Sequence, residues 1–295
     1  MNTAADLAVI DRLTGGRLGT HDVPCPLCGP FKSPHGRRRK VMRVWRIEPG
    51  FATYHCSRCG KSGYVRDRHA PTPDPARLAQ ARAEAAERDR IHRASRLAKA
   101  HWLWSRRQPA AGTLAETYLR DARGYHGPLP ATLGFLPSSG KYPPAMIAAF
   151  GVAHETETGV IAIADDAVRG VHITRLLPDG SGRERGDRAK IMIGHSIGSP
   201  IVLAAPNDLL GLAIAEGVEK TLTAHEATGL GAWAAGCASR LPALADAIAP
   251  YIENVTIVAD DDPDGRRHAA TLAERLRARG IEARIIVPNL WRGAA

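Results

Sequence analysis

The sequence predicts an α/β protein, with a parallel sheet in its C-terminal part preceded by a mixed α+β part and a small cysteine-bearing unit. Three observations support this prediction. Short apolar runs at 212–215 and 255–259 each end in an acidic residue, and helical patterns lie between and after them. Strands that alternate with helices form parallel sheets with right-handed crossovers. Near the N-terminus, two Cys-x-x-Cys-Gly motifs indicate a separate unit built around a metal ion.

The N-terminal unit is predicted from its cysteines. Each Cys-x-x-Cys-Gly motif turns tightly enough to present two thiolates to one ion, and four thiolates complete a tetrahedral zinc site. The four expected ligands are Cys25, Cys28, Cys56 and Cys59. Strands are expected between the motifs, at 41–47 and 52–54. The fifth cysteine, Cys237, is expected to be a small buried residue.

The sequence contains neither a signal peptide nor a long apolar segment. A disulfide framework is therefore the weaker interpretation of the cysteines, because disulfides persist mainly in oxidising compartments. We expect a cytoplasmic protein that has no membrane partner.

A linker and a helix are expected to follow the cysteine-bearing unit. Residues 66–75 contain three alternating prolines, which forbid a helix and favour extended backbone. Residues 76–107 are rich in Ala and Arg and have a helical pattern. Its apolar side chains fall on one face at helical spacing, and they are Ile91, Ala94, Ala98 and Trp102.

The middle of the chain is expected to mix helix and strand. A capping-box pattern at 113–116 predicts the start of a helix that ends near Gly124. Candidate strands are 145–153, 160–164, 171–177 and 201–204. The domain organisation that we expect is 1–65, 66–110, 111–205 and 206–295.

Acidic residues follow two predicted strands of the C-terminal sheet. Glu216 follows the run at 212–215, and Asp260 and Asp262 follow the run at 255–259. Open α/β sheets bind their ligands at the carboxyl ends of the strands. Carboxylates held this close repel one another unless a cation neutralises them. The sequence therefore predicts a divalent-metal site at this edge of the sheet.

Helix and turn signals surround these acids. Helices are expected at 218–228 and 239–248, with a strand at 231–235 between them. Gly217 and Gly265 permit a sharp turn or a close approach of backbone to a ligand. Acids that follow a strand also serve as solvated turn residues or helix caps, and Asp264 is the expected cap of the last helix.

The acids carry a resemblance to a known family. Glu216-Gly217, followed by Asp260-x-Asp262-x-x-Gly265, resembles the toprim signature shared by bacterial-type primases, topoisomerases and some nucleases. The resemblance implies that Glu216, Asp260 and Asp262 are catalytic and organise one or two Mg²⁺ (or Mn²⁺) ions for phosphoryl transfer. Two features depart from the family pattern. Asp264 stands where many relatives carry a small residue, and Glu219-Lys220 replaces an acid that replicative primases often show after the Glu-Gly pair.

The order of the motifs extends the resemblance. A zinc ribbon at 21–63 before a toprim module resembles the DNA primases of phages, plasmids and mobile elements. The resemblance implies that the ribbon engages the template. It also implies that Arg175 and Lys190 lie along the groove for template and nucleotide, although solvated charges at strand edges are an equally simple interpretation of these two residues.

Charge is distributed unevenly. Residues 1–110 hold 22 Lys and Arg against 9 Asp and Glu, a net +13, whereas residues 111–295 hold 18 against 21, a net −3. A basic N-terminal part favours a nucleic-acid partner, and an acidic C-terminal part suits a cation site. The densest basic cluster is Arg37, Arg38, Arg39 and Lys40, expected on a loop of the ribbon. Trp45, Phe51 and Tyr54 alternate with basic residues and are candidates for stacking on unpaired bases, with at least one of them expected in the ribbon core.

The expected function is that of a DNA primase-like nucleotidyltransferase, which makes short primers on single-stranded DNA from nucleoside triphosphates during replication of a mobile element or phage. The sequence contains no Gly-x-x-x-x-Gly-Lys-[Ser/Thr] motif, so a helicase is expected as a separate partner. Two alternatives remain open: a toprim-type metal-dependent nuclease, and a non-catalytic zinc-ribbon DNA-binding protein.

Overall fold

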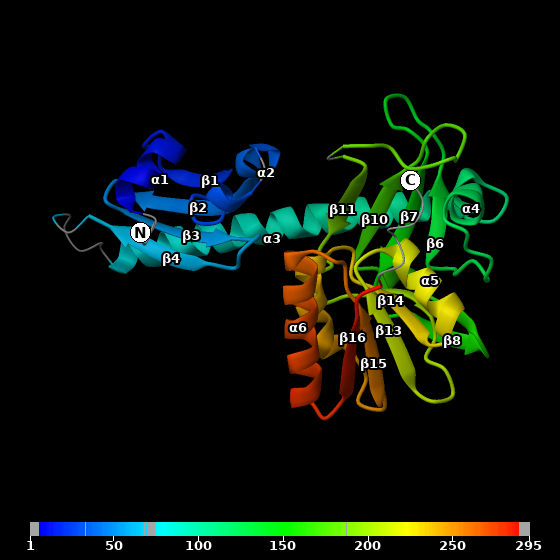
Figure 1. Cartoon of the computed structure of the whole chain (residues 1–295). Helices are drawn as coiled ribbons and strands as arrows, with labels where there is room; N and C mark the ends of the chain where they lie inside the picture. The colour runs from blue at the N-terminus through cyan, green and yellow to red at the C-terminus, as the bar shows by residue number, and fades with distance from the viewer. Residues whose placement is uncertain (1–5, 33, 68, 70–74, 187, 289–295) are drawn as a thin grey trace. The chain divides into compact units, whose positions relative to one another are not determined.

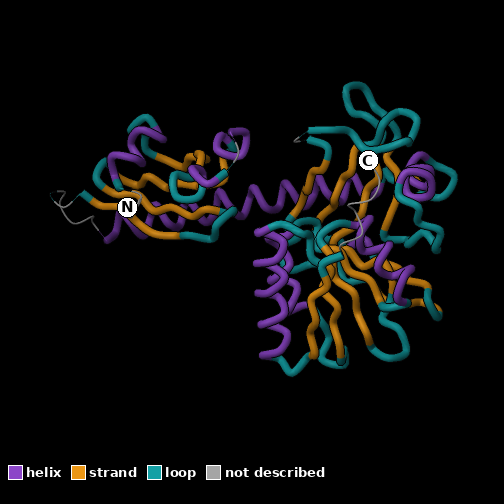
Figure 2. Tube along the Cα trace, in the orientation of Figure 1, coloured by secondary structure: helices purple, strands orange, loops and turns teal. Residues whose placement is uncertain are grey.

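The structure is a computed structural model that describes residues 6–32, 34–67, 69, 75–186 and 188–288. The chain forms two compact units, residues 1–90 and 91–295. Figure 1 traces their helices and strands along the chain, and Figure 2 separates helices, strands and loops by colour. Most of the expected linker, residues 68 and 70–74, lies outside the described residues.

The first unit is a four-stranded antiparallel sheet in the order β1-β2-β3-β4. Its strands are β1 (Gly19–Pro24), β2 (Lys40–Glu48), β3 (Phe51–Cys56) and β4 (Ser62–Arg66). Alternate residues of β2 are buried, and Met42 and Val44 pack against Ile10 of α1 (Leu7–Thr14). Asp6 caps this helix by accepting a hydrogen bond from the Val9 amide at 2.7 Å, which satisfies one free N–H of its first turn.

The basic cluster of the first unit is not a simple loop. A 3₁₀ turn η1 (Gly29–Phe31) and a short helix α2 (Pro34–Arg38) connect the first cysteine motif to β2. Arg37 and Arg38 lie in α2, Arg39 follows it, and Lys40 begins β2. All four residues are exposed.

Helix α3 (Pro75–Ser105) confirms the predicted helix at 76–107. The expected apolar face is wrong for the part of α3 that belongs to the second unit. Ile91 and Trp102 are more than half exposed, whereas Ala100 and Trp104 are buried against the strands of that unit. Ile91 and Trp102 do lie at helical spacing, but the strands pack against the neighbouring face of the helix, which carries Ala100 and Trp104.

The first half of the second unit is an antiparallel sheet in the order β11-β10-β7-β6-β5. Its strands are β5 (Gln108–Pro109), β6 (Leu133–Leu136), β7 (Ala145–Phe150), β10 (Gly170–Arg175) and β11 (Lys190–Gly194). The helical turns α4 (Leu114–Thr117) and η2 (Tyr118–Ala122) pack together with β6 and β7. A hairpin of β8 (His154–Glu157) and β9 (Val160–Ala162) is followed by a 3₁₀ turn η3 (Asp165–Ala167).

The second half of this unit is a five-stranded sheet in the order β12-β14-β13-β15-β16. Its strands are β12 (Ile201–Ala204), β13 (Gly211–Ala215), β14 (Gly231–Ala234), β15 (Asn254–Val258) and β16 (Glu282–Ile286). The last four are parallel, as the sequence predicts, and β12 pairs antiparallel with β14.

Helices lie along this sheet (Figure 1), as expected where parallel strands are joined by crossover connections. Helix α5 is Val218–Thr228, with the bounds that the sequence predicts, and α6 is Pro263–Ala278. The helix expected at 239–248 is a 3₁₀ helix, η4 (Ala238–Ala247). Pro242 lies inside it, and a proline cannot donate the hydrogen bond that a regular α-helix needs there.

The two halves of the second unit share a core. Val218 and Leu222 of α5 pack in one cluster with Tyr118, Phe150 and other residues of the first half, whereas α6 and η4 pack in another cluster together with β15. No helix in the described part of the chain combines the length and apolar character that a membrane span requires.

Candidate metal centres

Two parallel neighbours, β13 and β15, deliver the acids of the C-terminal sheet to one edge. Ala215 at the end of β13 is paired with Val258 at the end of β15. Glu216 follows β13 directly, and Asp260 lies two residues after β15. Because the strands are parallel and in register, the segments that follow them leave the sheet at the same edge.

Gly265 shows how closely these acids approach one another. A Cβ at this position would lie 2.9 Å from Glu216 Oε1 and 3.2 Å from the Cβ of Asp260. It would also lie 2.8 Å from the Asp260 carbonyl oxygen. Any side chain would clash there, so glycine is required for the first turn of α6 to pack between the two acids. Glu216 and Asp260 therefore converge on the same point of the fold.

One oxygen of the Glu216 carboxylate lacks a hydrogen-bond partner within the described residues. This atom, Oε1, is buried and accepts no hydrogen bond. Burial, and next the negative charge of Asp262, raise the pKa of Glu216, while Lys220 opposes this effect. A buried carboxylate oxygen without a partner is costly. Carboxylate oxygens are the ligands that Mg²⁺ takes from proteins, so the side chain fits a divalent ion.

Asp260 and Asp262 already make contacts of their own. Asp260 forms an ion pair with Lys220 of α5. Asp262 caps α6, because its Oδ1 accepts a hydrogen bond from the Gly265 amide at 2.7 Å. The expectation that Asp264 is the cap is therefore wrong. The side chain of Asp262 reaches the free amide of the third helical residue, whereas Asp264 lies inside the helix, 3.0 Å from Arg267.

The three acids do not form a tight ligand set. In the described part of the chain, the only group of three or more Cys, His, Asp or Glu residues whose ligand atoms cluster closely is made of the four cysteines. The fold brings Glu216 and Asp260 together, but Lys220 holds the Asp260 carboxylate and the capping bond holds that of Asp262.

Opposing effects act on the pKa of the lysine at this site. Burial lowers the pKa of Lys220, whereas the charges of Glu216 and Asp262 act to raise it. Its Nζ also lies 3.5 Å from the carbonyl oxygen of Ala259. The ammonium therefore interacts with all three acids of the predicted site.

A second polar cluster lies beside the acids and joins the two halves of the second unit. Lys190 Nζ lies 3.0 Å from the carboxylate of Glu219, and Tyr118 Oη donates a hydrogen bond to Glu219 Oε1 at 2.8 Å. A Cβ on Gly217 would lie 3.2 Å from Glu219 Oε2, which places this cluster next to the turn after Glu216.

Glu219 is ionised although only 5% of its surface is exposed. Burial opposes ionisation, but the charge of Lys190 and hydrogen bonds from backbone, Lys190 and Tyr118 outweigh it and lower the pKa of Glu219 to about 2. Burial and the charge of Glu219 together raise the pKa of Tyr118. Losing one partner of such a pair leaves a charge buried alone, which typically costs about 3–5 kcal/mol.

His172 lies in β10 beside the same cluster and is 2% exposed. Burial is the main cause that lowers the pKa of His172 to about 4, and the positive charges of Lys190 and Arg240 add to it. The imidazole is therefore neutral at physiological pH.

Arg175 and Lys190 come from neighbouring strands, but each has an acidic partner. Arg175 ends β10 and lies 3.8 Å from Glu184, and Lys190 begins β11 and pairs with Glu219. Lys190 remains 30% exposed, whereas Glu219 is buried, so the cationic end of this pair faces outward.

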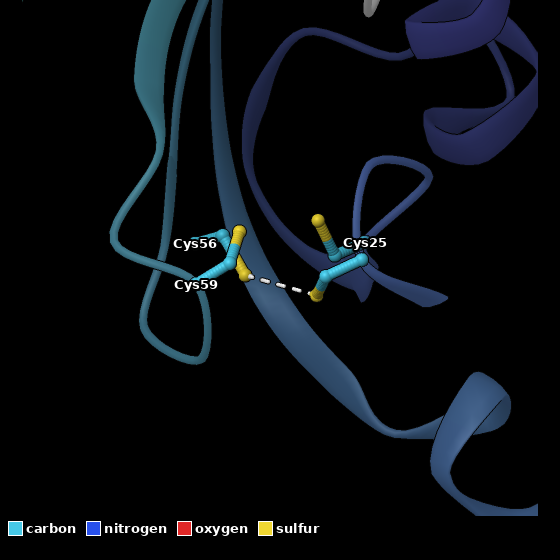
Figure 3. Close-up of side chains that lie close together, drawn as sticks. Cys25, Cys56 and Cys59 are labelled. Carbon is cyan, nitrogen blue, oxygen red and sulfur yellow. Dashed lines mark hydrogen bonds between the residues drawn. The ribbon is translucent and has the colours of Figure 1, made fainter. Parts of the chain in front are cut away.

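The four cysteines of the first unit come together as the sequence predicts. Their Sγ atoms all lie within 4.8 Å of one another, and Cys28 Sγ lies 3.9 Å from Cys56 Sγ. Tetrahedral coordination with Zn–S bonds of about 2.3 Å places sulfurs about 3.8 Å apart, so the set fits zinc. Figure 3 shows Cys56 and Cys59 facing Cys25 from a separate segment of the chain.

Crowding of the thiols has an electrostatic consequence. Burial first, then contact with Cys25 and the charges of the other cysteines, raise the pKa of Cys28. A bound cation removes this repulsion because it neutralises the thiolates. All five cysteines are free of disulfides, and Cys237 is half-buried rather than buried as expected.

Sequence reasoning did not identify Tyr118, His172 or the pairing role of Lys220. The contact between Tyr118 and Glu219 joins residues far apart in the sequence, so no local pattern reveals it. Lys220 did leave a signal, because it lies four residues after Glu216, in the first turn of the helix that follows this acid.

Comparisons with known proteins identify two regions of the chain. Residues 211–293 match the family described as Toprim domain, and residues 94–203 match a domain of unknown function (DUF7146). A search of curated proteins gave no match. The toprim match confirms the fold class that the sequence predicts for the C-terminal part.

Two solved structures resemble the fold at low sequence identity. The primase of Aquifex aeolicus (zinc binding and RNA polymerase domains) is 14% identical, covers 96% of this chain and 77% of its own, and has a TM-score of 0.39. The primase fragment of the bacteriophage T7 primase-helicase protein is 12% identical, covers 91% of this chain and 90% of its own, and has a TM-score of 0.36.

The cysteine cluster yields a prediction about zinc. The variant Cys25→Ser removes one of four thiolates, and we expect it to lose about one zinc per chain and to lower the thermal stability of the first unit, because binding of a structural metal contributes directly to folding. Elemental analysis measures the zinc. Cys237→Ser is the matched control and is expected to keep the metal. Retention of zinc by Cys25→Ser would refute the four-thiol site.

His172 yields a prediction about pH. Its pKa is about 4 in the folded chain and 6.5 in its unperturbed form, so protonation favours the unfolded state. The neutral imidazole makes its full contribution to the unfolding free energy above pH 6.5, and this contribution is lost as the pH falls from 6.5 to about 4. The variant His172→Met lacks the titrating group, so over this pH range its unfolding free energy should fall by about 3 kcal/mol less than that of the wild-type protein. Urea unfolding across the range measures it, with exposed His126→Met as the control, and equal slopes in all three proteins would contradict the assignment.

Proposed function

We propose that this chain is a DNA primase-like nucleotidyltransferase, which joins nucleotides into short primers on single-stranded DNA in the replication of a phage or mobile element. The observation that carries the proposal is the buried, unpartnered Glu216 Oε1, which faces Asp260 across Gly265 within a toprim domain. The same chain carries a four-thiol cluster in a basic N-terminal unit.

Glu216, Asp260 and Asp262 would hold the divalent cation, Mg²⁺ or Mn²⁺. When bound, such an ion neutralises phosphate charge and lowers the pKa of an attacking hydroxyl. Glu216 has a further property of its own. It would also accept the proton that leaves the primer 3′-hydroxyl, since a carboxylate positioned beside the reacting group can act as a general base.

Lys190 and Arg175 would bind phosphate groups of the nucleoside triphosphate and template. The partly exposed side chain of Lys190 is held in place by the buried carboxylate of Glu219, and Tyr118 fixes that carboxylate in turn. A cation that is already oriented loses less side-chain entropy when phosphate binds. Arg175 is oriented by the carboxylate of Glu184 on the adjacent loop.

The first unit would engage the DNA template. Arg37, Arg38, Arg39 and Lys40 are exposed and follow the first cysteine motif. Phe51 stacks on Tyr64 at 6.0 Å between ring centroids, and Tyr64 is 70% exposed, so it offers a ring for an unpaired base. Tyr54 instead packs against the ribbon core, and Trp45 is half-buried. A separate helicase would supply single-stranded template.

A template-dependent assay with labelled nucleoside triphosphates tests this proposal. The wild-type protein is expected to produce short oligonucleotides in the presence of Mg²⁺ or Mn²⁺, and Asp260→Ala is expected to lose at least a hundredfold in rate because a cation ligand is removed. Asp246→Ala, an exposed acid of η4, is the matched control and should retain activity.

The products distinguish the alternatives. Shortened DNA without new oligonucleotides would show a toprim nuclease that uses the same carboxylates to activate water. DNA binding without either product would show a non-catalytic binding protein. Primer synthesis that Asp260→Ala leaves unchanged would contradict the assigned site.

A further inference from the structure

Lys220 occupies an unusual position for a lysine. It lies in the first turn of α5, one turn after Glu216, and its ammonium pairs with Asp260 Oδ1. Its side chain is 28% exposed, so the charge is partly withdrawn from water. Lysine carries a compact point charge on a flexible stem, and such a charge can take the place of a small cation among carboxylates.

The remaining acids at the strand ends have other cationic partners. Arg266 forms an ion pair with Asp261, and Arg267 lies 3.0 Å from Asp264. The acids that face the Gly265 turn are then Glu216, Asp260 and Asp262, with a combined charge of −3 when all are ionised. The ammonium of Lys220 reduces this to −2. A single divalent ion balances that charge, whereas two divalent ions would leave the cluster at +2, compared with +1 in the absence of the lysine.

The acids also differ in whether a cationic side chain already holds them. Asp260 is held by Lys220, while Glu216 Oε1 is buried and lacks a partner within the described residues. A two-ion site needs a bridging position, with ions about 3.5–4 Å apart and ligands shared between them. Lys220 contacts the Asp260 carboxylate and the Ala259 carbonyl, so its ammonium already occupies oxygens that a cation could otherwise bind.

We propose that Lys220 is a built-in cation that replaces one of two divalent ions, so that the toprim site of this chain binds a single ion through Glu216 and its acidic neighbours. This inference rests on the proposed function, because it assumes that the acids hold a divalent ion. Lys220 then acts as a positioning residue, which orients Asp260 and neutralises charge without binding substrate.

Counting bound Mn²⁺ tests the inference without an activity assay. The full-length, zinc-loaded chain is titrated with Mn²⁺, and the free ion is measured by electron paramagnetic resonance. The wild-type chain is expected to bind one ion that Glu216→Gln loses. Lys220→Gln is expected to bind two ions, with the spectral broadening of a coupled pair, whereas Lys220→Arg keeps the positive charge and should bind one.

The outcomes separate this inference from the proposed function. Two Glu216-dependent ions in the wild-type chain, or a count of one in folded Lys220→Gln, would overturn the role of Lys220 alone. The wild-type count decides the matter even where the Gln variant fails to fold. Mn²⁺ binding that is absent, or unaffected by Glu216→Gln, would overturn the cation site, the role of Lys220 and the proposed chemistry together. One Glu216-dependent ion without primer synthesis would refute only the proposed function.

Discussion

Mutual repulsion among carboxylates is the constraint on which the candidate site of the second unit depends. Parallel pairing of Ala215 with Val258 sends Glu216 and Asp260 off the same edge of the sheet, and the missing side chain of Gly265 lets α6 begin between them. Hydrophobic burial of β13 and β15 fixes this arrangement, because their side chains are among the most buried of the chain. The fold therefore concentrates negative charge at a point where only a cation can relieve it.

Buried contacts with the surrounding structure hold this edge of the sheet in place. Glu219, on the first turn of α5, is held by Lys190 and Tyr118, which belong to the region matched by the domain of unknown function. The same helix contributes Val218 and Leu222 to a core shared with that region. The two matched regions therefore form one compact unit, joined by a buried ion pair and a shared core.

The sequence predicted those features that depend on local pattern. Alternating apolar runs and helices gave the parallel sheet and the bounds of α5, and the two Cys-x-x-Cys-Gly motifs gave the clustering of four thiols. It did not predict features decided by contacts between distant residues. The face of α3 that is buried, with Trp104 rather than Trp102, depends on which strands lie against it. The cap of α6 depends on whether Asp262 or Asp264 reaches the Gly265 amide. The Lys220–Asp260 pair depends on two strand ends meeting, so Glu219-Lys220 was visible only as a departure from the family pattern.

We propose that acids from two strand ends share one cation site beside Gly265. Diffraction from crystals soaked in Mn²⁺, recorded where manganese scatters anomalously, tests it most directly. We expect an anomalous peak within bonding distance of Glu216 Oε1 and of a carboxylate oxygen of Asp260 or Asp262. A map without a peak there, in crystals whose cysteine cluster shows bound zinc, would contradict it.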